Sequence, residues 1–98
     1  KCYVYVRPEL LAEGWNRDRI VAQINALGVP CFQGTCSEVY LGKAFDGTGL
    51  RPAQRLPVAQ ALGEASMMFL VHPTLTPAEV EKTCVVIATV MEQACLNA

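Results

Sequence analysis

The feature that most constrains the fold is a strand, turn and helix encoded in residues 66–95. Ser66–Val71 is a short, almost wholly apolar run, which is typical of a buried strand. Pro73 ends this strand, because proline has no N–H group to donate to a sheet. Thr76 is then a predicted helix N-cap, followed by Pro77 at the first helical position and by Glu79 where a capping box requires it. The last third of the chain is therefore predicted to be a buried strand that leads into a long helix.

The predicted helix after Thr76 has one clearly apolar face. We expect the following residues, which recur at helical spacing, to be buried: Val80, Cys84, Ile87, Met91 and Cys95. A hydrophobic content of 52% is high for 98 residues. Part of the apolar surface is thus expected to meet a partner domain or a second subunit, with a well-filled core as the alternative.

Two further strands and a helix are predicted in the first third of the chain. Cys2–Arg7 is rich in the β-forming residues tyrosine and valine, with the tyrosines on one face and the valines on the other, and it ends at a proline. Asn16 can cap a helix that ends at Gly28, and Val29–Phe32 is a second short strand. The buried side of that helix is expected to consist of Ile20, Val21, Ile24 and Leu27.

The middle of the chain is less regular. Ser37–Phe45 can form one or two helical turns, and Asp46–Gly49 has the composition of a turn rather than of a phosphate-binding loop. Pro57 suits the start of a short helix, Val58–Leu62, which Gly63 is predicted to end.

The order β-α-β-β-α, with the short extra helix before the third strand, predicts one α+β domain over residues 1–98. Its architecture would be a two-layer sandwich, in which two main helices pack on a small three-stranded sheet. The first two strands are either parallel neighbours or separated by the third strand.

Charge and composition exclude several classes of function. The net charge is −1 and the basic residues are scattered, so there is no electrostatic footprint for nucleic acid. No apolar run reaches the roughly 18 residues that a membrane span needs. The five cysteines are expected to be reduced cytosolic thiols, with Cys84 and Cys95 buried. Cys31 and Cys36 do not have the spacing of a zinc pair, so no metal site is predicted.

No catalytic residue is predicted in the chain. His72 adjoins a proline at a strand end and is expected to make structural hydrogen bonds. Lys1, Lys43 and Lys82 do not lie in the apolar surroundings that would favour Schiff-base chemistry.

Three segments in this order resemble one enzyme family. They are Tyr3–Val6, the Arg-Asp-started helix and Leu-Gly-Val of residues 17–29, and the Phe-Leu-Val-His-Pro-Thr-Leu-Thr turn of residues 69–76. The chain resembles the C-terminal small domain of the DegT/DnrJ/StrS-type sugar aminotransferases, which depend on pyridoxal 5'-phosphate (PLP). Because the sequence enters a strand at once and without a methionine, we also expect it to be a piece of a longer protein.

The resemblance implies a cytoplasmic, homodimeric enzyme that transfers an amino group, typically from glutamate, to a nucleotide-linked keto-sugar. The pathway would be surface polysaccharide or modified-sugar biosynthesis. PLP would be bound by a lysine in the large domain of the same chain, so residues 1–98 would not catalyse the reaction alone. The alternatives are a free-standing α+β ligand-binding or regulatory module and a dimerisation module.

The resemblance also points to a substrate site. Members of the family commonly have a Tyr-x-Pro-x-His run near the sugar, whereas the corresponding residues 31–40 contain no histidine here. The residues expected to contact the sugar are Thr35, Ser37, Glu38 and Tyr40. Further along the chain, Arg51 and Arg55 could bind a phosphate or carboxylate, with an ordinary exposed loop as the alternative.

Overall fold

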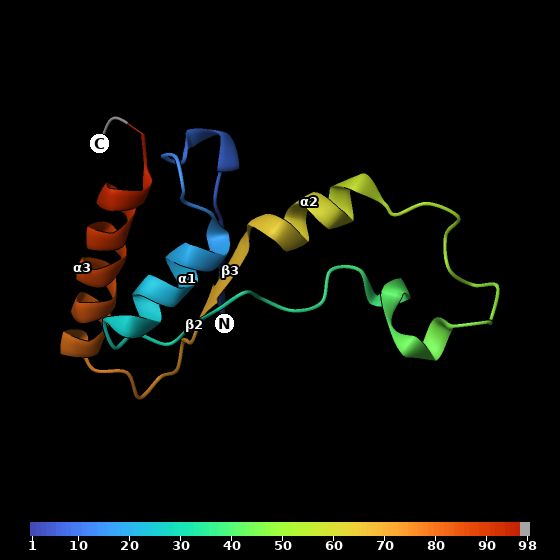
Figure 1. The fold of residues 1–98 in the computed structure, drawn as a ribbon. Helices are drawn as coiled ribbons and strands as arrows, with labels where there is room; N and C mark the ends of the chain where they lie inside the picture. The colour runs from blue at the N-terminus through green and yellow to red at the C-terminus, as the bar shows by residue number, and fades with distance from the viewer. Residues whose placement is uncertain (97–98) are drawn as a thin grey trace.

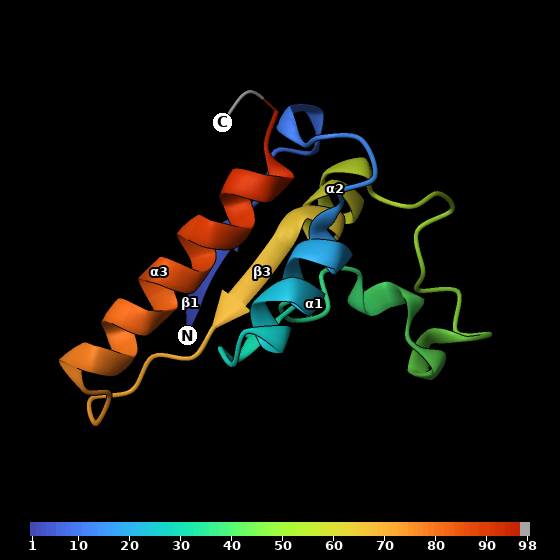
Figure 2. The same ribbon diagram turned by 60° about the vertical axis from the view of Figure 1, so that its left-hand side comes forward.

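The computed structural model describes residues 1–96, which form a three-stranded sheet with helices on one face (Figures 1 and 2). The strands are β1 (Cys2–Tyr5), β2 (Cys31–Phe32) and β3 (Ser66–Phe69). Their order is β1-β3-β2, and both outer strands run antiparallel to β3. The predicted α+β class is confirmed, and the third strand separates the first two.

Two main helices cover the sheet. In Figure 2, α1 (Arg17–Ala26) and α3 (Pro77–Ala94) lie side by side in front of the strands. α1 packs against β2, β3 and α3. The remaining elements are a short helix, α2 (Pro57–Ala65), and the 3-10 turns η1 (Pro8–Leu10), η2 (Val39–Leu41) and η3 (Lys43–Phe45).

The helix ends follow the predicted local chemistry. The Asn16 side chain accepts a hydrogen bond from the backbone N–H of Arg19, and the Thr76 hydroxyl accepts one from the N–H of Glu79. Gly28 has a φ of 90°, which is the left-handed conformation expected just after a helix. Both predicted N-caps are therefore confirmed.

The core lies between α1, α3 and the inner face of the sheet. Its members are Val6, Ile20, Ile24, Val29, Cys31, Ala65, Met67, Phe69, Val86, Val90 and Ala94. Ile20 and Ile24 are completely buried, as predicted, and Val21 is partly buried. The prediction for Leu27 is wrong, because this residue is 47% exposed. Leu27 is the C-cap of α1, and its backbone has already left the helical conformation that would return it to the buried face.

The predicted buried face of α3 is also wrong. The residues that α3 buries are Val86, Val90 and Ala94, which lie beside the predicted face. By contrast Val80 and Cys84 are exposed, and the other three predicted residues are only partly buried. The physical reason is that α3 packs sideways onto α1, so its second apolar face is turned towards the uncovered part of the sheet.

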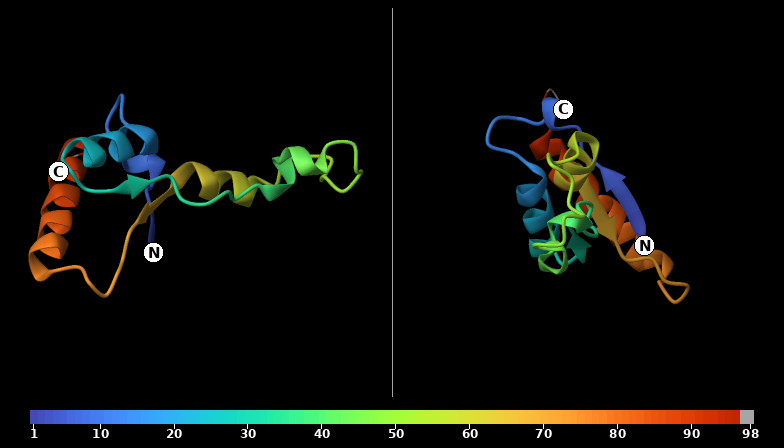
Figure 3. Two further views of the ribbon diagram at one scale, coloured as in Figure 1. Left: turned by 90° about the horizontal axis from the view of Figure 1, so that it is seen from below. Right: turned by 90° about the vertical axis from the view of Figure 1, so that its right-hand side faces the viewer.

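Residues 33–65 form an arm that projects from the body of the molecule (Figure 3). The molecule measures 49 × 36 × 18 Å, and its radius of gyration is 16.1 Å. A compact chain of about 100 residues has a value of about 13 Å. α2 is the returning leg of the arm and runs through Gly63 to Ala65, so the prediction that Gly63 ends this helix is wrong. Gly63 instead allows the outgoing leg to approach, because a Cβ there would collide with the Ser37 side chain.

Within residues 1–96, no helix has both the length and the apolar character needed to cross a membrane. All five cysteines are free thiols, of which Cys31 is buried. Cys84 is exposed and Cys95 is partly buried, contrary to the prediction for these two thiols.

Candidate functional site

The candidate site is a cavity of about 520 Å³ between the two legs of the arm, where the arm joins the body. We call it the arm cavity. Its walls come from the start of α1, the outgoing leg and the returning helix α2. The lining residues are Arg17, Gln33, Gly34, Thr35, Cys36, Ser37, Glu38, Leu41, Gly42, Gln60, Gly63 and Glu64.

Arg17 holds the base of the arm together. Its guanidinium donates hydrogen bonds to the carbonyl oxygens of Gly63 at 2.7 Å and Ser66 at 2.8 Å. The same group forms an ion pair with Asp18 at 2.8 Å, and the Asp18 carboxylate in turn accepts a hydrogen bond from the Gln33 amide. Arg17 follows the N-cap of α1 directly, so the helix start fixes its position. The first residue of α1 thereby connects both legs of the arm to the sheet.

The backbone at the start of the outgoing leg requires glycine. Gly34 has a φ of 97°, which side-chain-bearing residues rarely adopt. A Cβ at this position would lie 3.0 Å from the Ser66 hydroxyl oxygen. That hydroxyl donates a hydrogen bond to the Gln33 carbonyl oxygen at 2.8 Å. The leg can therefore pass close to the start of β3 and form the floor of the cavity.

Glu38 closes the outer end of the cavity through an internal network. Both of its carboxylate oxygens accept hydrogen bonds from Arg55, and one also accepts a bond from the Tyr40 hydroxyl at 2.7 Å. The Tyr40 oxygen accepts the backbone N–H of Leu56 at 2.8 Å. The Arg55 hydrogen bonds, and then that of Tyr40, lower the pKa of Glu38 from its ordinary 4.5 to about 2. Glu38 is therefore ionised at neutral pH, and its charge is neutralised by Arg55.

The surroundings of Tyr40 in this network also change its pKa. Burial, followed by the hydrogen bond to Glu38, raises the pKa of Tyr40. Arg51, the second arginine of the arm, bonds to the carbonyl oxygens of Tyr40 and Gly42 and forms an ion pair with Asp46. Both arginines that the sequence suggested for anion binding are therefore engaged inside the arm.

The predicted sugar-binding residues are partly brought together. Thr35, Ser37 and Glu38 line the arm cavity, with Thr35 and Ser37 exposed. Tyr40 does not line it and lies behind Glu38. Sequence reasoning missed Arg17 as a site residue, although it stands within the family-like helix start. The signal that could have found it is its place directly after the N-cap, next to an aspartate.

The arm cavity does not fit PLP as its own binding site. A PLP enzyme holds its cofactor through a Schiff-base lysine, and no lysine lines the cavity among the described residues. Residues 1–96 contain no group of three or more histidine, cysteine or acidic side chains placed to hold a metal ion. His72 is exposed and bonds to Thr74 two residues away, in agreement with its predicted structural role.

The fold and much of the sequence are shared with a solved enzyme structure. The chain is similar to the aminotransferase from Psychrobacter cryohalolentis, with a TM-score of 0.89 and 61% sequence identity over 92% of the chain. The match covers 23% of that protein, so the chain spans about a quarter of its length. No protein-family model matches the chain, and no curated protein matches it either. The expectation of an aminotransferase-like sequence is supported by this similarity.

Proposed function

We propose that residues 1–98 are the C-terminal small domain of a PLP-dependent aminotransferase of the DegT/DnrJ/StrS type. The observation that carries the proposal is the 61% identity to an aminotransferase over 92% of the chain. Since the chain corresponds to only about a quarter of that enzyme, PLP and its lysine would belong to a large domain elsewhere in the longer protein. That protein would be a cytoplasmic homodimer.

The proposed substrate is a nucleotide-linked keto-sugar, used in surface polysaccharide or modified-sugar biosynthesis. The arm cavity would receive its sugar, because the lining is rich in hydroxyl, amide and carboxylate groups that can bond to a polyhydroxylated ligand. Thr35 and Ser37 would contact the sugar through exposed hydroxyls. Glu38 would present its carboxylate at the cavity wall, and Tyr40 would hold that carboxylate in place.

The residues of this chain would bind and orient, and would not carry the chemical step. Arg17 would fix the distance between the two legs of the arm, and Gly34 would let the backbone approach β3. A pre-formed site of this kind lowers the conformational entropy that the protein loses when the sugar is bound. The amino-group transfer itself would occur next to residues of the large domain.

The test uses the full-length protein. It should show the absorbance of a PLP–lysine adduct and aminate at least one member of a panel of nucleotide-linked keto-sugars. In Ser37→Ala, loss of one hydrogen bond should raise KM for the sugar about tenfold with kcat nearly unchanged. The matched control is Thr89→Ala, which removes an exposed hydroxyl of α3 that bonds only within the helix.

Two results would contradict the proposal separately. A full-length protein that binds neither PLP nor any amino donor would exclude the aminotransferase. If Ser37→Ala left the sugar kinetics equal to those of Thr89→Ala, the sugar would lie elsewhere. Ligand binding without PLP would favour the alternative of a regulatory or binding module.

A further inference from the structure

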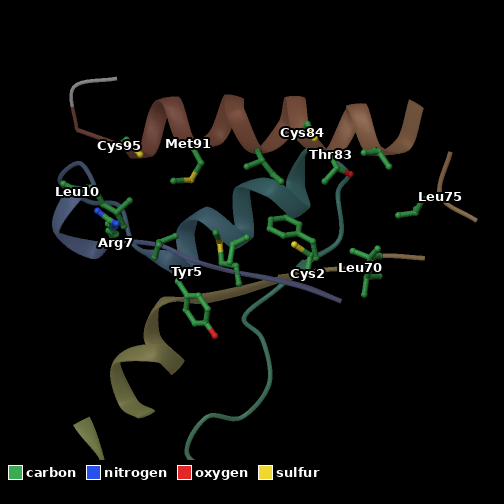
Figure 4. Close-up of a pocket in the computed structure, with 18 residues that line it drawn as sticks. Cys2, Tyr5, Arg7, Leu10, Leu70, Leu75, Thr83, Cys84, Met91 and Cys95 are labelled. Carbon is green, nitrogen blue, oxygen red and sulfur yellow. The ribbon is translucent and has the colours of Figure 1, made fainter. Parts of the chain in front are cut away.

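A long apolar groove lies between β1 and α3, on the side of the sheet that faces the helices (Figure 4). Its volume is about 680 Å³, larger than that of the arm cavity. Among the described residues that line it, Arg7 alone carries a charge. The groove is separate from the arm cavity, because the two have no lining residue in common.

One wall of the groove is the second apolar face of α3. Val80, Cys84, Ile87, Met91 and Cys95 all line it. These are the residues for which the sequence predicts burial and which the structure leaves exposed or partly exposed. At 1.5 Å per residue the stripe is about 22 Å long, or four helical turns. The apolar pattern therefore extends well beyond the residues that contact α1.

The opposite wall is the inner face of β1. In the paired strand β3, Met67 and Phe69 are buried beneath the helices. Their partners across the sheet, Val4 and Cys2, are half-buried and exposed. The difference arises because α1 covers β2 and β3, while α3 packs against α1. Within residues 1–96, no helix packs extensively on β1, and α3 faces it across the groove.

We propose that this groove is the docking site for an amphipathic helix of about four turns, supplied by the rest of the aminotransferase chain. The inference rests on the proposed function, under which more than three quarters of the polypeptide lies outside the matched region. A helix fits because the apolar stripe on α3 extends over four helical turns, and neighbouring helices pack with their axes about 8–10 Å apart. Its contacting face must be apolar, since the walls present almost no charge. A segment joined to β1 would reach the groove directly, because Cys2 is one of its lining residues.

The cysteines of the groove provide the test. The rate at which iodoacetamide alkylates Cys84 is measured by peptide mass mapping, in the full-length native protein and in denaturant. The rate in denaturant divided by the native rate is the protection factor. A docked helix should protect Cys84 at least a hundredfold. The matched control is Thr89→Cys, a conservative change at an exposed position of α3 outside the groove, which should be protected less than fivefold.

Three outcomes would overturn the proposal. The first is a Cys84 that reacts as fast as the control thiol, and the second is equal protection of both thiols. The third is protection of Cys84 that disappears on dilution, because that result would identify a second copy of the protein as the occupant. PLP absorbance is recorded on the same samples. Protection without PLP would reject the proposed function alone, and a reactive Cys84 in a PLP-binding enzyme would reject the docking alone.

Discussion

Replacing Arg17 by alanine removes the side chain that joins both legs of the arm to the sheet. The guanidinium is largely buried, with 12% of the side chain exposed, and it bonds to the carbonyl oxygens of Gly63 and Ser66. Gly63 lies in the last turn of α2, where carbonyl groups have no partner within the helix. The substitution therefore leaves two partly buried acceptors without their donor.

The expected cost follows from these two bonds. A hydrogen bond to a charged group contributes about 1.5–3 kcal/mol, so two contribute about 3–6 kcal/mol. The third contact, to the Gln33 carbonyl oxygen at 3.5 Å, is too long to add much. Water can reach the freed carbonyls from the arm cavity, which places the loss at the lower end, about 3 kcal/mol. For a domain of this size that corresponds to a decrease in Tm of about 12–24 °C.

Chemical denaturation followed by circular dichroism measures this loss, with Arg19→Ala as the matched control. Arg19 is an exposed arginine of the same helix that stacks on Trp15 and bonds to the Gly14 carbonyl oxygen, so its removal should cost less than about 1 kcal/mol. Arg17→Lys should be intermediate, because one ammonium group can replace Nη1 as the donor to the carbonyls but cannot also keep the Nε bond to Asp18. Equal losses of stability in Arg17→Ala and Arg19→Ala would refute the proposed role of Arg17 in joining the arm to the sheet.

Two further predictions concern the network at Glu38 and the core. The Glu38 carboxyl should titrate near pH 2 by NMR, and its pKa should return towards 4.5 in Arg55→Ala. Because the pKa is lower in the folded state, the stability that Glu38 contributes is present above pH 4.5 and is lost as the pH falls through about 2. A wild-type titration midpoint near 4.5 would exclude the ion pair. Ile24→Ala should lower the free energy of unfolding by about 3–4 kcal/mol, whereas the exposed Leu27→Ala should cost under about 1 kcal/mol; similar losses would mean that α1 continues beyond Ala26 and buries both.

The local elements could be predicted because neighbouring residues decide them. The N-caps at Asn16 and Thr76 and the stop at Gly28 depend on hydrogen bonds and backbone angles within a few residues. The prediction for Gly63 failed because the same residue type also serves close packing, and Ser37 approaches it from a segment distant in sequence. The signal for a helix stop and the signal for a tight contact are identical in a sequence.

The candidate site was predicted only in part. Thr35, Ser37 and Glu38 are near one another in sequence, so a short loop was enough to bring them to one cavity. Arg17 reaches that cavity from another element, and Arg55 reaches Glu38 from 17 residues away. Such partners depend on how the arm folds back, and helical or strand periodicity carries no information about that.

By itself, the sequence determined the three strands to within two residues, the two helix N-caps and the apolar character of α3, since these depend on local geometry and on side-chain type. Only the tertiary structure decided which of the two apolar faces of α3 is buried. Periodicity reveals that a face is apolar but not what covers it. Val86 and Val90 are buried in the core that α3 shares with α1, whereas Cys84 lies at an open groove. The tertiary structure likewise decided that residues 33–65 project as an arm, because that shape is held by Arg17 and Glu38 through contacts between distant segments.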